Sequence, residues 1–294
     1  MKKSDLEEAV LKIKNSVHDC VTTKYYNGRL YPTGWAAKDA LVKSSTLIQV
    51  IHEAVKNGLH DELRQRKIEH VIHPPLGVHT PESNVWGLLK KKRQDVVVLI
   101  GNAKPTPELI EEGPLMGQQD LLGRAATKQA IVIGVRSQLS SVDNNFDTLM
   151  ERALAETLNL RLRHPHLVMG EVFLLAVKEY DHRKMRANQV EWNNKFTNVE
   201  RFISIFEGLS GREDHQEMKQ AYKYERSALL LVDFSLKTPK IYWTLDELRA
   251  DKIVSDDFTR DYTKLSPLNF SKDLLDSYVS RHADQKQTTS STSQ

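Results

Sequence analysis

The sequence predicts an α/β protein with a central mixed β-sheet flanked by helices. Short apolar runs typical of buried strands recur along the chain, and segments with helical periodicity lie between them. This alternation of strands and helices is the pattern of a sheet covered by helices. The strands are expected at residues 96–100, 131–135, 168–177 and 228–234, and helices at about 146–163 and near 196–208.

A helical portion precedes the sheet. Residues 4–7, SDLE, have the capping-box pattern that opens a helix. Residues 18–34 are expected to form a loop. A second helix is expected from Trp35 to Asn57, with Gly58 as its stop signal. The apolar face of the first helix comprises Leu6, Val10, Ile13 and Val17.

The chain is expected to form one domain, since 294 residues suffice for a substantial core. Residues 1–69 are expected to be mainly helical, 70–235 to form the α/β core and 236–282 to form a C-terminal helical segment, so that the domain spans 1–282. The segment 283–294 is polar and low in complexity, which predicts a disordered tail.

Composition favours a cytoplasmic protein. The sequence has no apolar run long enough to cross a bilayer, and its first residues lack the apolar core of a secretory signal. A single cysteine excludes a disulfide framework and a zinc site built from several cysteines. The net charge of +3 is compatible with nucleic-acid binding without indicating it.

Charged side chains stand at the ends of the first two core strands. Asp95 directly precedes the strand 96–100, and Arg136 follows the strand 131–135. A carboxylate at a rigid strand end can bind Mg²⁺, whose ligands are oxygen atoms. A cation on a neighbouring strand can hold a phosphate and stabilise developing charge. The same pair is about equally compatible with an ion pair that closes the sheet.

The helix expected at 146–163 adds two glutamates. Glu151 and Glu156 border its apolar stripe on opposite flanks, so either carboxylate can reach a site at the sheet edge. Glu156 has an alternative partner in Arg152, one helical turn earlier, which ranks Glu151 slightly higher. Both glutamates are also compatible with a solvated helix flank.

Small hydrogen-bonding side chains are dense between the strand 131–135 and this helix. Serine, asparagine and glutamine can contact bases or phosphates, and serine and asparagine also cap helices. A basic cluster before Asp95 is a second candidate for phosphate contacts, although such clusters are more often solvated. The candidate DNA-binding residues are Ser137, Gln138, Ser140, Ser141, Asn144 and Asn145 in the first group and Lys91, Lys92 and Arg93 in the second.

Residues 80–180 resemble the catalytic core of type II restriction endonucleases of the PD-(D/E)XK superfamily. The resemblance rests on TPESNVWGLLKKKRQDVVVLIG and AIVIGVRSQLSSVDNNFDTLMERALAETLNL. The subgroup it resembles has its second acidic residue on a helix instead of a strand. Asp95 matches the family's aspartate, Arg136 stands in place of its lysine, and Glu151 or Glu156 matches the helical glutamate. Arginine departs from the pattern because it is bulkier and stays protonated, and Lys92 is the nearest lysine that could serve instead.

The resemblance implies a restriction-endonuclease-like fold and a sequence-specific, Mg²⁺-dependent endonuclease that hydrolyses phosphodiester bonds in double-stranded DNA. Asp95 and Glu151 would bind the metal, which activates water, and Arg136 would hold the phosphate. A homodimer on a two-fold-symmetric DNA site is implied as well. Two alternatives stay open: a DNA-binding protein that does not cleave, which the arginine favours, and an interaction protein that uses the N-terminal helices.

Overall fold

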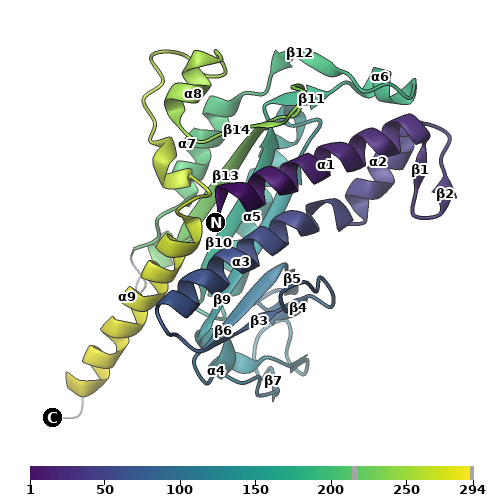
Figure 1. The fold of residues 1–294 in the computed structure, drawn as a ribbon. Coiled ribbons are helices and arrows are strands. Elements are labelled where there is room, and N and C mark those ends of the chain that lie inside the picture. The colour runs from purple at the N-terminus through teal and green to yellow at the C-terminus, as the bar shows by residue number, and fades with distance from the viewer. Residues whose placement is uncertain (214–217, 292–294) are drawn as a thin grey trace.

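The centre of the molecule is a six-stranded mixed sheet (Figure 1). The computed structural model describes residues 1–213 and 218–291. The three middle strands are parallel, and the outer strands are antiparallel to their neighbours. All four strands expected from the apolar runs belong to this sheet, so the predicted α/β class is confirmed. Across the sheet the strands are β14 (Lys240–Tyr242), β13 (Arg226–Asp233), β10 (Val168–Ala176), β9 (Ala130–Gln138), β6 (Val96–Ile100) and β3 (His70–His73).

Helices cover both faces of the sheet, because successive strand residues point to opposite sides. Val96 and Val98 of β6 join the core on the first face, and Val97 and Leu99 join the core on the second. Both cores are apolar and nearly solvent-free. The first face packs against α1 (Lys3–Thr23), α2 (Gly34–Lys43), α3 (Gln49–Gln65) and α9 (Phe270–Ser291), and the second against α4 (Gly123–Lys128), α5 (Phe146–Arg161), α7 (Val199–Leu209) and α8 (Leu245–Ala250).

The first helix differs from its predicted bounds at both ends. The helix N-cap is Lys2, which makes no side-chain capping bond, and Ser4 instead donates to Asp5 within the first turn. The helix continues to Thr23, and a short hairpin of β1 (Tyr25–Tyr26) and β2 (Arg29–Leu30) follows. The loop predicted for residues 18–34 was therefore wrong over most of its length.

The second predicted helix is in fact two helices, α2 and α3, separated by a turn. The helical conformation is interrupted at Ser45, whose φ is +63°, and the chain then forms the short 3-10 helix Thr46–Ile48. Gly58 does not stop α3, which runs on to Gln65. A Cβ on Gly58 would lie 2.6 Å from Oγ of Ser271 in α9. The glycine therefore permits close packing of two helices, a role that its sequence position alone does not distinguish from a stop signal.

Short elements fill the connections between the sheet strands. A hairpin of β4 and β5 leads directly into β6, and the insertion at 102–128 contains a second hairpin and α4. Thr244 is the N-cap of α8, since its side chain accepts from the backbone N of Glu247. The elements not yet named are β4 (Ser83–Trp86), β5 (Lys91–Gln94), β7 (Glu108–Leu109), β8 (Gln119–Asp120), β11 (Lys178–Tyr180), α6 (His182–Arg186) and β12 (Trp192–Phe196), with 3-10 turns at Asp143–Asn145, Met218–Gln220 and Tyr262–Leu265.

The C-terminal part of the chain combines a strand with helices. The segment 236–282, predicted as helical, also contains the edge strand β14. Helix α9 continues to Ser291, so the predicted disordered tail lies partly in α9, and residues 292–294 lie outside the described residues. Within the described part of the chain, no helix has the length and apolar character needed to cross a membrane.

Candidate functional site

Asp95 lies between β5 and β6 and is tied to the neighbouring strand β9. Its Oδ2 accepts a hydrogen bond from the backbone N of Val135 at 2.6 Å. Burial raises the pKa of Asp95 to about 6, even though the Val135 amide and the Arg136 guanidinium favour the charged form. The position expected from the sequence, a carboxylate held at a strand end beside the next strand, is therefore present.

Two side chains that the sequence analysis did not identify lie beside Asp95. His52 comes from α3, and Glu82 directly precedes β4. One ligand atom from each of the three residues lies within 4.8 Å of the others. His52 Nε2 is 3.8 Å from Asp95 Oδ1, and it has no hydrogen-bond partner among the residues that the structure describes. We call His52, Glu82 and Asp95 the ligand cluster.

The histidine of the ligand cluster is suited to bind a metal. Its side chain is 3% exposed, and burial, with the nearby His79 and Lys56, lowers the pKa of His52 to about 4. The imidazole is thus neutral at neutral pH, which is the form that coordinates a cation. A buried nitrogen without a partner is costly unless a ligand satisfies it. The two carboxylates and one imidazole fit a divalent cation.

Glu156 of α5 binds side chains from two different strands. Its Oε2 lies 2.6 Å from Arg136 Nη2 and 2.6 Å from Lys92 Nζ. Its Oε1 accepts from Gln94 Nε2 at 3.2 Å. The carboxylate is almost fully buried, so these contacts hold α5 against β5 and β9. The structure therefore joins two of the predicted catalytic residues, Arg136 and Glu156, and adds Lys92 to them.

Glu151 lies apart from this network. It is exposed on α5, whereas Glu156 is buried. The ranking that placed Glu151 first assumed that Glu156 pairs with Arg152 on the helix surface. The geometry reverses that ranking, because Glu156 faces the strands and pairs with Lys92 and Arg136 instead.

Glu171 of β10 is a further functional candidate, in addition to His52 and Glu82, that the sequence did not reveal. Arg136 Nε lies 3.3 Å from its Oε1, yet neither carboxylate oxygen has a hydrogen bond among the described residues. Burial raises the pKa of Glu171 to about 8, and Arg136 offsets only part of that effect. The attraction of Glu171 is in turn the main reason that the pKa of Arg136 is raised. The sequence signal was a single acidic residue within the apolar run VMGEVFLLAV.

A glycine on the next strand makes room for Glu171. Gly134 of β9 is paired with Glu171 in the sheet register. A Cβ at Gly134 would lie 2.4 Å from Glu171 Oε2. The absence of a side chain at Gly134 therefore allows a carboxylate from β10 to reach Arg136 across the strand.

The polar segment 137–145, which begins within the last residues of β9, makes mainly contacts inside the protein. The backbone N atoms of Ser141 and Val142 donate to the carboxylate of Glu179, at 2.9 and 2.7 Å. Ser140 Oγ accepts from Lys38 Nζ at 2.8 Å, and Gln138 donates to a backbone carbonyl. The remaining candidates are half-buried Ser137 and the exposed pair Asn144 and Asn145, the latter of which makes no side-chain capping bond to α5.

The basic cluster of β5 points its side chains in different directions. Lys92 faces Glu156, whereas Lys91 lies over the ring of Trp86, with Nζ 5.4 Å from its centroid. Arg93 Nε lies 3.7 Å from Glu82 Oε2. Only Lys92 of the three therefore reaches the site around Arg136.

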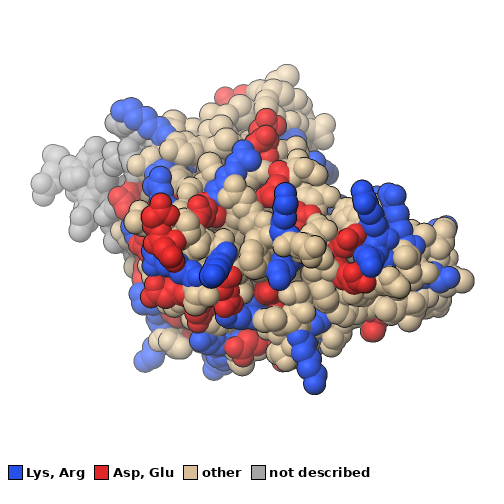
Figure 2. Space-filling model, turned by 90° about the horizontal axis from the view of Figure 1, so that it is seen from above, with Lys and Arg blue, Asp and Glu red and all other residues tan. Residues whose placement is uncertain are grey.

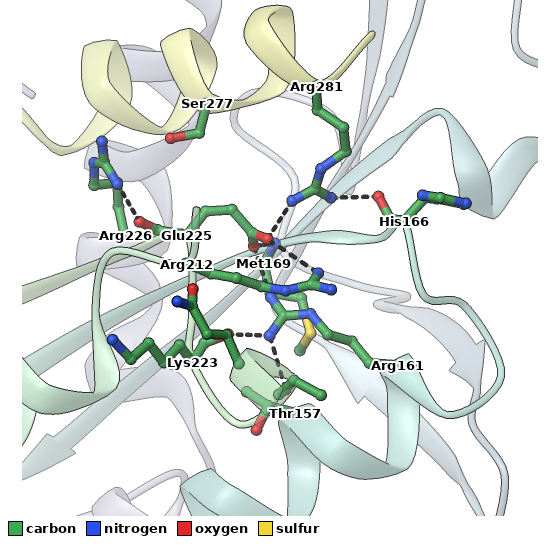
Figure 3. Close-up of polar contacts among 12 residues, drawn as sticks. Thr157, Arg161, His166, Met169, Arg212, Lys223, Glu225, Arg226, Ser277 and Arg281 are labelled. Carbon is green, nitrogen blue, oxygen red and sulfur yellow. Dashed lines mark hydrogen bonds and ion pairs between the residues drawn. The ribbon is translucent and has the colours of Figure 1, made fainter. Parts of the chain in front are cut away.

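Another buried carboxylate, Glu225, directly precedes β13 and contacts the end of α5 through Arg161. Figure 3 shows Arg161, Arg212 and Arg281 converging on Glu225 from α5, a loop and α9. Glu225 Oε2 also accepts from the backbone N of Met169 at 2.6 Å. Burial opposes ionisation, but the arginines and this amide lower the pKa of Glu225 to about 2.

The chain was compared with family models, curated proteins and solved structures. No family model, curated protein or solved structure matches the chain. Any functional interpretation therefore depends on the residues and geometry described above.

Proposed function

We propose that the protein is a metal-dependent endonuclease that hydrolyses phosphodiester bonds in double-stranded DNA, with a restriction-endonuclease-like fold. The observation that carries this proposal is the ligand cluster, which lies beside a strand that brings Arg136 to two buried carboxylates. A nuclease of this kind needs carboxylates for a metal and cations for a phosphate close to one another. Sequence specificity and a homodimer on a two-fold site are parts of the proposal that the resemblance implies.

The ligand cluster would hold the metal, and Asp95 would be the ligand with the most constrained position, because the Val135 amide fixes its other oxygen. The metal would supply the lowered pKa of a bound water and the stabilisation of the leaving oxygen. Carboxylates suit Mg²⁺ and Mn²⁺ equally, while an imidazole is a poorer ligand for Mg²⁺. We therefore propose Mg²⁺ or Mn²⁺, with Mn²⁺ the tighter binder.

Arg136 has a different role from the one expected from the sequence alone. Its guanidinium contacts both Glu156 and Glu171, so it is a positioning residue that holds two carboxylates beside Asp95. Lys92 is the cation that we propose to face the phosphate, since it pairs with a single carboxylate.

The test uses the full chain and an unmodified mixed-sequence linear duplex, with Mg²⁺, with Mn²⁺ and with EDTA. Discrete fragments that require metal are expected from the wild type and from the control His60→Gln, and none from Asp95→Asn or His52→Gln. His60 lies two turns along α3 from His52 and hydrogen-bonds to His70. Mn²⁺ binding measured by electron paramagnetic resonance should be lost in His52→Gln and kept in His60→Gln.

The second candidate is a protein that binds duplex DNA without cleaving it. This candidate is favoured because Arg136 stands where the family has a lysine and is already engaged by two carboxylates. Intact DNA that shifts in a gel with either metal and with EDTA would support this candidate and contradict the nuclease. Neither cleavage nor a shift at low salt would contradict both.

A further inference from the structure

The strongest further feature is the space beside Glu156, between β5 and α5. A pocket of about 370 Å³ opens there. Four cationic side chains and one carboxylate line it, together with two small apolar surfaces. The lining residues are Lys90, Lys92, Arg136, Arg152, Glu156, Leu149 and Ala155. We call it the basic pocket.

The cations of the basic pocket are only partly neutralised. Lys92 and Arg136 share one oxygen of Glu156. Lys90 and Arg152 are exposed, and across residues 1–213 and 218–291 no ion pair is found for either side chain. Glu156 offsets part of the charge of Lys92 and Arg136, and Glu171 also pairs with Arg136, so Lys90 and Arg152 supply the positive charge that favours an anion.

This concentration of one sign contrasts with the face of the molecule seen in Figure 2. The face drawn in Figure 2 carries acidic and basic side chains interspersed, without a broad field of either sign. The net charge of the whole chain is only +3. An anion is thus attracted to the basic pocket by local charge rather than by the protein as a whole.

The wall that carries Lys90 is held in place before any ligand binds. Asn159 of α5 accepts from the backbone N of Leu89 at 2.8 Å and donates to the carbonyl of Lys90 at 2.9 Å. Gly87 lies so close that a Cβ there would be 2.2 Å from Asn159 Nδ2. The turn between β4 and β5 is therefore docked on α5, which reduces the entropy lost when an anion binds.

We propose that the basic pocket binds a backbone phosphate of DNA next to the phosphate that is cleaved. Lys90 and Arg152 would contact its oxygens, and Leu149 and Ala155 would contact the adjoining deoxyribose. The pocket is adjacent to the ligand cluster, because Gln94, which precedes Asp95, donates to Glu156. The inference rests on the proposed function for the identity of the anion, since a free phosphate has the same chemistry.

The first experiment measures duplex DNA binding by fluorescence anisotropy in EDTA, from about 50 to about 200 mM KCl. Lys90→Gln/Arg152→Gln should reduce the slope of log K against log salt by about 1 to 2 units and weaken binding by about 10- to 100-fold. The control Arg64→Gln/Lys67→Gln removes two exposed cations near the far end of α3, about 18 Å along the helix from His52. It should keep the wild-type slope.

A second variant changes binding in the opposite direction. Glu156→Gln removes the carboxylate that competes with an anion for Lys92 and Arg136, so DNA should bind severalfold more tightly in EDTA. If Lys90→Gln/Arg152→Gln binds DNA like the control, the basic pocket is not a DNA contact and the inference is overturned, while the nuclease proposal is judged separately by cleavage.

The same variants distinguish the two sources of phosphate. Inorganic phosphate is titrated into the full chain and followed by ³¹P NMR. A wild type that binds inorganic phosphate through Lys90 and Arg152 but does not bind DNA would overturn both the DNA contact and the proposed function. Binding of DNA, with free phosphate bound at most weakly, is the result expected here.

Discussion

Two buried groups of carboxylates and arginines contact α5. The pKa of Glu171 in the first group is raised, and the pKa of Glu225 in the second is lowered. Burial disfavours the charged form of both Glu171 and Glu225. Three arginines and a backbone amide overcome that penalty at Glu225, and its pKa falls to about 2. One arginine, shared with Glu156, does not overcome it at Glu171, and the pKa of Glu171 rises to about 8. The nearby cations decide the direction at Glu225, and at Glu171 the nearby carboxylates Glu156 and Asp95 add to the rise in pKa.

The opposite pKa shifts distinguish a cluster that stabilises the fold, at Glu225, from a site that can bind a further cation, around Asp95. Glu225 has an excess of positive partners and ties α5, α9 and β13 together. Around Asp95 acidic side chains outnumber basic ones. The acidic side chains are Glu82, Asp95, Glu156 and Glu171, and their cationic partners are Arg136, Lys92 and the more exposed Arg93. A divalent cation in the ligand cluster would correct that deficit.

The largest expected effect is on cleavage. Asp95→Asn keeps the acceptor for the Val135 amide but removes a charged metal ligand, so metal-dependent cleavage should fall by about 10⁴-fold, or roughly 5.5 kcal/mol. The free energy of unfolding without metal, measured in urea, should stay the same or rise, because a buried charge is removed. An equal loss of stability and activity would make this cluster structural, like the one at Glu225.

Stability should respond most to the fully compensated cluster. Glu225→Gln leaves Arg161, Arg212 and Arg281 around a neutral amide, and the expected loss in free energy of unfolding is about 3–5 kcal/mol. Urea denaturation at neutral pH measures it. A loss below about 1 kcal/mol would mean that the backbone carbonyls that also bind these arginines suffice, and that Glu225 adds little.

The two clusters should also differ in the pH dependence of stability. A folded pKa of Glu171 above its unfolded value stabilises the protein fully below about pH 4.5 and loses that contribution as pH rises to about 8. Glu171→Gln should therefore flatten the decline in the free energy of unfolding between about pH 5 and 8. The lowered pKa of Glu225 acts below about pH 4.5, so Glu225→Gln should leave the slope in that window unchanged. Parallel pH profiles for wild type and Glu171→Gln would contradict the raised pKa.

The smallest effect is expected from Arg136→Lys. Lysine keeps the charge but lacks the planar fork that reaches Glu156 and Glu171 together. Cleavage should fall by about tenfold and not disappear, because Lys92 remains beside Glu156. Complete loss in a folded variant would show that the guanidinium itself contacts the substrate.

The sequence was sufficient to predict β6, β9, β10 and β13, which match the four apolar runs, but not the edge strands β3 and β14. It also predicted that Asp95, Arg136 and Glu156 lie near one another, and their catalytic roles stay predictions. It did not predict His52, which reaches the site from another helix by tertiary packing. The available signal was its position on the apolar stripe of α3, between Ile51 and Val55, where a histidine is buried.

The errors have similar physical causes. Glu151 was ranked above Glu156 because helical periodicity locates a flank without showing which flank meets the sheet. Glu171 was missed because Gly134, on another strand, provides its space. Such choices depend on long-range neighbours that local patterns do not contain.

The docking of the β4–β5 hairpin on α5 has a consequence for the linkage between ligands. Glu82 leads into this hairpin, and Lys90 and Lys92 belong to it, so one rigid unit carries contacts for the proposed metal and for the proposed phosphate. If metal binding selects one position of that unit, DNA binding becomes tighter by some factor. Thermodynamic reciprocity then requires DNA to tighten metal binding by the same factor.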